Sequence, residues 1–205
     1  MMAARALPAI LALAALPLAA AAQAAPCAPL TNDAERLACD AGRADVIVAR
    51  GEQLFGAAPE DWLRIVDTVS PSGASYVYSV SEDGPYLLLE ARSVPRRDAG
   101  ENAPACQLRT TLPLDVATKV KTAAAAIAAA PPSFYGPREA ATVNPDGSRS
   151  IRLIVDSHDI ITRLGNGEAA LTFSRLAATE DDITELNNLV IGVANFSGDW
   201  TCGAD

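Results

Sequence analysis

The chain has 205 residues and a formal net charge of −9, from 16 lysines and arginines against 25 aspartates and glutamates. No stretch gathers the basic residues that a phosphate backbone or an anionic membrane surface requires, so we expect neither nucleic acid nor membrane among its partners. Hydrophobic residues make up 50% of the sequence. Although alanine-rich segments inflate this figure, the length permits one domain with a substantial core.

Residues 1–24 have the features of a secretory signal peptide. Arg5 supplies a positive charge, residues 7–18 form an apolar run too short to span a bilayer comfortably, and residues 22–24 form an A-x-A cleavage site. The sequence therefore predicts bacterial export, with the protein located in the periplasm or secreted.

Cleavage at this site would leave residues 25–205 as a single exported domain. Pro26 precedes Cys27, where a lipoprotein signal would need a small residue. We therefore expect neither a lipid anchor nor stable membrane insertion once the leader has been removed.

The four cysteines predict two disulfides, because an oxidising compartment removes the pressure to keep thiols reduced. Of the three possible pairings we favour Cys27 with Cys39, which flank a short segment, and Cys106 with Cys202, which each follow an extended segment. A zinc site is the alternative, but the cysteines lack C-x-x-C spacing and the chain has one histidine. We expect no metal and no other cofactor.

The first predicted element after the leader is a short helix. Asn32 followed by Glu35 is typical of a helix N-cap with its reciprocal partner, and this helix would run through Cys39. A second helical stretch is expected over residues 43–54, ending at Gly56.

The pattern then changes to short segments rich in aromatic and β-branched residues, separated by turn signals, which is typical of an antiparallel meander. The predicted strands cover residues 62–69, 76–80, 86–91 and 107–112.

Asp115 is expected to cap the next helix. Its apolar residues Val116, Val120, Ala124 and Ile127 recur at spacings of four, four and three, so they form one stripe. More strand-like segments follow, and Thr179 with Asp182 marks the start of a last amphipathic helix. These later strands are expected at residues 140–143, 151–156, 160–164 and 170–176.

The predicted fold is α+β, an antiparallel sheet with two amphipathic helices and a short disulfide-stapled N-terminal helix. Residues 68–73 are echoed by residues 142–147, each time between strands and ahead of a helix. Two similar halves would explain the echo. We favour the simpler interpretation that proline and glycine recur in hairpin turns.

His158 is the candidate for acid–base chemistry at neutral pH because it is the one imidazole in the chain. It lies between Ser157 and Asp159, but neighbours in sequence point in different directions and cannot form a catalytic triad. We therefore interpret His158 as a dispensable turn residue and assign no catalytic residues.

A loop bounded by prolines, residues 131–138, is the candidate partner contact. It presents Phe134 and Tyr135 beside Arg138, and these residue types are enriched where interfaces concentrate their binding energy. The alternative is that both rings fold inward against the sheet edge.

The start of the expected mature chain contains a short cysteine-bounded element. Its residues are Cys27, Asp33, Arg36, Leu37, Ala38, Cys39 and Asp40. This element resembles one that opens several proteobacterial periplasmic families, of which the accessory proteins of type VI secretion are the best described. The resemblance covers about fourteen residues and lacks the tyrosine that precedes the aspartate in those families. It implies an exported protein and supports the first disulfide.

These observations favour a small disulfide-stabilised periplasmic or secreted protein that binds another envelope or secreted protein without catalytic activity. The alternative is a hydrolase of the cell envelope that depends on carboxylates or on His158.

Overall fold

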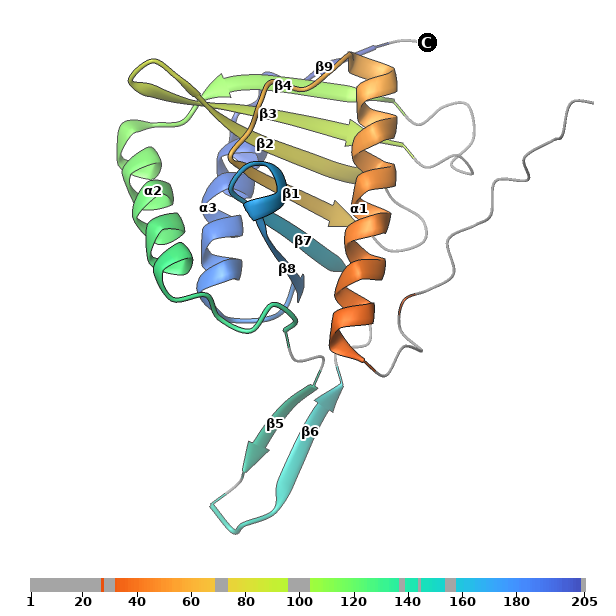
Figure 1. Ribbon diagram of the computed structural model, residues 1–205, viewed down its shortest axis with the longest axis vertical. Coiled ribbons are helices and arrows are strands. Elements are labelled where there is room, and N and C mark those ends of the chain that lie inside the picture. Colours follow the sequence, from red (N-terminus) through yellow and green to blue (C-terminus); the bar gives the residue numbers. More distant parts are fainter. Residues whose placement is uncertain are drawn as a thin grey trace, which may run out of the picture.

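The computed structural model describes residue 27 and residues 32–68, 74–95, 104–136, 139–143, 145–153 and 158–203. Within these residues, three α-helices accompany a seven-stranded sheet and a separate two-stranded hairpin (Figure 1). The predicted signal peptide lies outside the described residues. In the described part of the chain, no helix combines the length and apolar character needed to cross a membrane.

All neighbouring strands of the main sheet are antiparallel, in the order β8-β7-β1-β2-β3-β4-β9, which confirms the predicted α+β fold class. The eight predicted strands all form, with ends shifted by at most three residues, and β9 was not predicted. The strands of the sheet are β1 (Leu63–Thr68), β2 (Ser75–Asp83), β3 (Tyr86–Val94), β4 (Cys106–Thr111), β7 (Asp159–Leu164), β8 (Leu171–Leu176) and β9 (Thr201–Cys202).

The remaining strands, β5 (Glu139–Val143) and β6 (Arg149–Leu153), pair only with each other and project from the body of the molecule (Figure 1). The first half of the chain thus gives the sheet four consecutive strands, β1 to β4, whereas β7 and β8 come from the second half. Both echoed turn segments include residues outside the described part of the chain, so the repeat stays a hypothesis.

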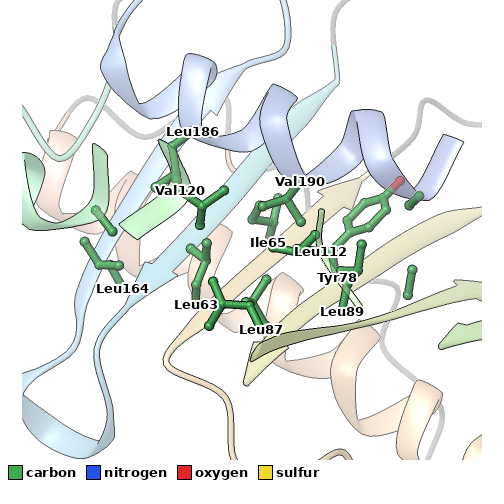
Figure 2. Close-up of a cluster of buried hydrophobic side chains, with 14 of the residues drawn as sticks. Leu63, Ile65, Tyr78, Leu87, Leu89, Leu112, Val120, Leu164, Leu186 and Val190 are labelled. Atoms are coloured by element: carbon green, nitrogen blue, oxygen red, sulfur yellow. The ribbon is translucent and has the colours of Figure 1, made fainter. Parts of the chain in front are cut away.

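The larger core lies between the sheet and two helices, α2 (Leu114–Ala129) and α3 (Asp182–Phe196) (Figure 2). Side chains of β1 alternate between the two faces, so that Leu63 and Ile65 point into this core. The predicted stripe of α2 is buried at Val120, Ala124 and Ile127. Burial of this apolar surface is the main driving force for the fold.

The opposite face of the sheet is covered by α1, which runs without a break over Asp33–Phe55. The expectation of two shorter helices is therefore wrong. An interior glycine such as Gly42 costs a helix only about 1 kcal/mol relative to alanine, and packing of Ala44 and Val48 against the sheet favours continuation. Their buried neighbours in this second cluster are Val66, Val77, Val94 and Ile161.

The helix ends follow local chemistry with two corrections. Asn32 caps α1 as predicted, by accepting a bond from the Ala34 N–H, and Gly56 ends it with φ at 84°. The α2 helix follows Pro113 without a side-chain cap, so Asp115 lies in its first turn instead. The cap of α3 is Asp181 rather than Thr179, because the Asp181 carboxylate accepts from the Thr184 N–H.

Candidate functional site

Both disulfides form in the favoured pairing. Cys27 is joined to Cys39 across a sequence separation of 12 residues, and Cys106 to Cys202 across 96 residues. The second bridge links directly opposed residues of β4 and β9, so it holds the C-terminal segment against the edge of the sheet. The two disulfides fit a protein that folds in an oxidising compartment.

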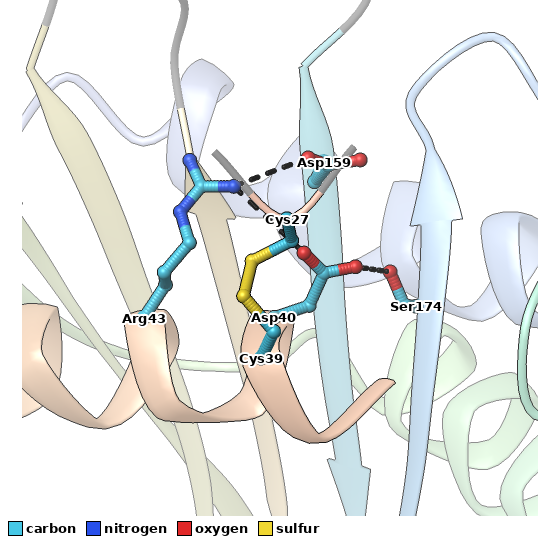
Figure 3. Close-up of a disulfide and its surroundings, with 6 residues drawn as sticks. All are labelled: Cys27, Cys39, Asp40, Arg43, Asp159 and Ser174. Atoms are coloured by element: carbon cyan, nitrogen blue, oxygen red, sulfur yellow. Dashed lines mark hydrogen bonds and ion pairs between the residues drawn. A yellow bond between two sulfur atoms is a disulfide. The ribbon is translucent and has the colours of Figure 1, made fainter. Parts of the chain in front are cut away.

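The first disulfide stands beside a buried carboxylate (Figure 3). Asp40, with an exposed fraction of 0%, accepts a hydrogen bond of 2.7 Å from the Ser174 hydroxyl on β8. The Arg43 guanidinium lies 3.8 Å from the other oxygen of Asp40 and 3.5 Å from Asp159. These contacts fasten the N-terminal half of α1 to β7 and β8, which gives the resembling element a structural role.

The candidate contact loop lies along the outer edge of β8. The Gly136 N–H donates to the Ser174 carbonyl, and the Ser174 N–H donates to the Phe134 carbonyl, both at 2.9 Å. The Phe134 ring stacks on the buried Phe173, with ring centroids 5.4 Å apart, and remains 43% exposed. The half-buried Tyr135 ring lies under the Arg36 guanidinium at 5.8 Å. The main chain of the loop therefore closes this edge of the sheet.

A buried arginine holds the same loop from inside. Arg175, only 2% exposed, donates to the carbonyls of Ser133 and Phe134 at 2.6 and 3.2 Å and pairs with Asp181 at 2.5 Å. Burial alone would raise the pKa of Asp181, but the Thr184 N–H and the Arg175 guanidinium together hold this pKa below its usual value. Arg138, the third predicted contact residue, lies outside the described residues.

His158 has a partner that the sequence did not identify. Its Nε2 lies 2.8 Å from Oδ1 of Asp67, which comes from the neighbouring strand β1. The adjacent Asp159 points to the other face of the sheet, toward Arg43. The histidine is therefore part of a cross-strand pair rather than a solitary turn residue.

The surroundings of this pair shift the pKa values of two acidic groups, Asp67 itself and the nearby Tyr78. Burial raises the pKa of Asp67, and His158 offsets only part of that rise. Burial also raises the pKa of Tyr78, and the negative charge of Asp67 and the neighbouring Tyr76 raise it further. Tyr76 in turn packs against Trp200, with ring centroids 6.2 Å apart. A carboxylate whose charge is disfavoured by burial is a marker of functional sites, although structural pairs show it too.

A different feature dominates the outer surface of the α2–α3 layer. A groove of about 450 Å³, which we call the edge groove, opens where the end of β4, the start of α2 and the last two turns of α3 meet. Its lining includes Thr110, Pro113, Val116, Leu189, Val193 and Phe196. It continues along α2 and α3 into a second hollow of about 670 Å³ that shares Leu189.

Two large apolar side chains of the α2 and α3 helices are highly exposed. Phe196, which lines the edge groove, is 93% exposed, and Leu114 at the first position of α2 is 78% exposed. The sequence contained a signal for this surface, because Leu189, Val193 and Phe196 form an apolar stripe beside the buried one. The structure buries Ala194, whereas Val193 is only partly buried, packing against the core while it also lines the groove.

Comparisons with protein-family models, with curated proteins and with solved structures find no match for this chain. The resemblance of the N-terminal element to periplasmic accessory proteins therefore stays an expectation. Among the described residues, no group of three or more His, Cys, Asp and Glu side chains is placed to hold a metal ion.

Proposed function

We propose that this protein is a non-catalytic binding or accessory protein of the bacterial periplasm or of the secreted fraction, and that its partner is another envelope or secreted protein. The observation that carries the proposal is the exposed apolar surface at the edge groove. Solvent-exposed phenylalanine and leucine beside an apolar hollow mark interaction sites in folded proteins. Here the phenylalanine is Phe196, which lines the hollow, and the leucine is Leu114, which begins the helix that contributes Val116 to the lining.

The buried charges support the same proposal, because their contacts join elements of the fold. Arg175 connects β8 with the loop before β5 and with the cap of α3. Arg92 pairs with Glu90 and donates to the Gly56 carbonyl at the end of α1. Together with two disulfides, these contacts describe a stiff scaffold, and a stiff scaffold lowers the entropic cost of binding a partner.

The loop with Phe134, Tyr135 and Arg138 remains a second proposed contact. We favour the edge groove over it because the loop already serves the fold by closing β8. Phe134 nevertheless keeps enough exposed ring to contribute to a partner surface.

The test is capture of partners from intact periplasm by in-cell cross-linking, with the tagged exported protein as bait. We expect one reproducible envelope or secreted partner, with capture by Phe196→Ser reduced and capture by Tyr86→Ser unchanged. Tyr86 is a matched control, since it is an exposed ring on the β2–β3 hairpin. Intact mass of the same material should place the new N-terminus at residue 25. Absence of any reproducible partner would contradict the proposal.

One observation favours a second candidate, the hydrolase. The Asp67–His158 pair supplies a base and a carboxylate that orients it, two of the three parts of a nucleophilic site. The test is hydrolysis of ester, amide and glycoside model substrates by the wild type and by His158→Ala. Activity that disappears in His158→Ala at a temperature well below the melting temperature of that variant, and persists in the surface control Tyr86→Ser, would establish this candidate instead.

A further inference from the structure

The two edges of the main sheet are protected to different extents. The loop with Phe134 pairs with the β8 edge at Ser174. At the other edge, β9 is only two residues long, and its disulfide-stapled pairing with β4 covers Cys106 and Gln107. Among the described residues, no strand pairs with the remainder of that edge, residues 108–111.

The register of the sheet identifies which main-chain groups are open. The Leu112 N–H donates to the Leu87 carbonyl at 2.8 Å, and hydrogen-bonded and non-hydrogen-bonded pairs alternate along an antiparallel ladder. Thr110 and Leu108 therefore bond toward β3, whereas the N–H and C=O of Arg109 and Thr111 point outward. The same alternation agrees with the bond from the Gly203 N–H to the Ala105 carbonyl, on the outer side of β4.

The edge groove lies directly beside these open groups. Thr110 and Thr111 line it together with Val116, Val193 and Phe196. Thr110 is opposite Leu89 and so faces the α2–α3 layer, which means that a residue paired with Thr110 would also face that layer. Its side chain would enter the groove next to Phe196. One place thus offers main-chain hydrogen bonds and an apolar hollow for alternate side chains.

We infer that residues 108–111 and the edge groove bind an extended segment of a partner protein as an added β-strand. This inference rests on the proposed binding function and assigns its surface. Main-chain pairing supplies affinity in such complexes, and hollows for alternate side chains supply specificity. The segment carries apolar side chains toward the groove and uncharged polar ones on its other face, because a basic side chain there would lie opposite the exposed Arg109.

A second copy of this chain fits the edge less well. Self-pairing would bring together two molecules of the same net charge. If the two edges paired antiparallel about Arg109, the Arg109 side chains of both copies would lie next to each other, and such like-charge pairs are destabilising. The arginine is exposed, with its guanidinium 3.8 Å from Glu90.

The experiment uses two synthetic octapeptides of identical composition, one alternating valine and serine and one with the same residues in adjacent pairs. Only the alternating peptide can present valine on one face of a strand, and both have the same charge. Nuclear magnetic resonance titration of the full mature protein should show shifts centred on the Arg109 and Thr111 amides, with the alternating peptide only. Equal effects of the two peptides, or shifts centred elsewhere, would overturn the inference.

Two variants separate main-chain pairing from side-chain contact. Thr111→Pro removes an N–H that the β3–β4 ladder does not use and should abolish the shifts. Phe196→Ser leaves the backbone intact and should weaken binding by about tenfold, a usual effect of losing one aromatic anchor. Tyr86→Ser should bind as the wild type does. If Thr111→Pro has a lower melting temperature than the wild type, the affinity of Phe196→Ser for the alternating peptide becomes the test of the site.

The same variants distinguish this inference from the proposed function. If both Thr111→Pro and Phe196→Ser capture a cross-linked partner as well as the wild type does, the binding function is supported. The same result would show that the β4 edge is not the binding site. A concentration-dependent dimer that disappears in Thr111→Pro would replace the partner segment by a second copy and overturn the proposal as well.

Discussion

Asp67 on β1 and His158 at the start of β7 lie 2.8 Å apart, at the end of the sheet where Thr68 donates a hydrogen bond to the Asp159 carbonyl. The pair fastens two neighbouring strands that come from different halves of the chain. Burial makes the Asp67 charge costly despite this partner, since the net effect is a raised pKa.

That raised pKa predicts a pH-dependent effect of Asp67→Asn. A carboxyl whose folded pKa exceeds the unfolded one contributes stability at pH values below the unfolded pKa, near 3.8, and this contribution is lost as the pH rises through the folded pKa. At neutral pH the Asp67→Asn variant should therefore melt at a higher temperature than the wild type. Below the ordinary pKa of aspartate the two should converge.

His158→Ala should act in the opposite direction at neutral pH, because it removes a group that lowers the pKa of Asp67 and leaves a buried carboxylate with less compensation. Thermal melts at pH 7 of the single variants and of the double variant with Asp67→Asn measure the coupling. Equal melting temperatures for the wild type and His158→Ala would restore the earlier interpretation of a dispensable turn residue.

Asp181→Ala should destabilise the protein at pH 7 by more than the cost of about 1 kcal/mol that is usual for a lost helix cap, because it also leaves the buried Arg175 without its carboxylate partner. The pKa of Asp181 is lowered in the fold, so its contribution is present above the unfolded pKa and is lost as the pH falls through the folded one. The exposed Asp182, one position on, is the matched control. Urea unfolding of the wild type and of Asp181→Ala at pH 7 and at pH 3 checks this pH dependence. A stability difference between the two proteins that is as large at pH 3 as at pH 7 would contradict it.

The double substitution Phe134→Ser with Tyr135→Ser tests whether the loop serves the fold or a partner. Truncating a fully buried aromatic residue costs about 3–5 kcal/mol, and Phe134 is only partly covered by Phe173. We expect a loss of stability of about 2 kcal/mol. An unchanged melting temperature combined with loss of partner capture would show instead that both rings belong to an interface.

Loss of the long disulfide should destabilise the protein more than loss of the short one. In the chain-entropy model, closing loops of about 15 and about 100 residues contributes about 3 and about 4.7 kcal/mol, and the two bridges here span 12 and 96 residues. The comparison is between two double variants, Cys27→Ser with Cys39→Ser and Cys106→Ser with Cys202→Ser. The free energy of unfolding of each is measured in urea. Peptide mapping without reductant checks the pairing, and a peptide linking Cys39 to Cys106 would refute it.

The sequence by itself determined the features that depend on neighbouring residues. Strand positions followed from alternation and turn chemistry, and the stripe of α2 followed from its periodicity. The disulfide pairing also followed from local context, because a short spacing favoured Cys27 with Cys39 and left Cys106 with Cys202. Fold class was predictable because such signals extend along most of residues 33–202.

Only the tertiary structure decided which distant groups meet. The partner of His158 is on β1, and the partners of Arg175 include a loop carbonyl from before β5, because strand order in a sheet is set by long-range packing rather than by adjacency in sequence. The same holds for the open edge of β4. Periodicity indicated an apolar face on α3, but only its packing against the sheet left Phe196 exposed and Val193 partly buried at the groove.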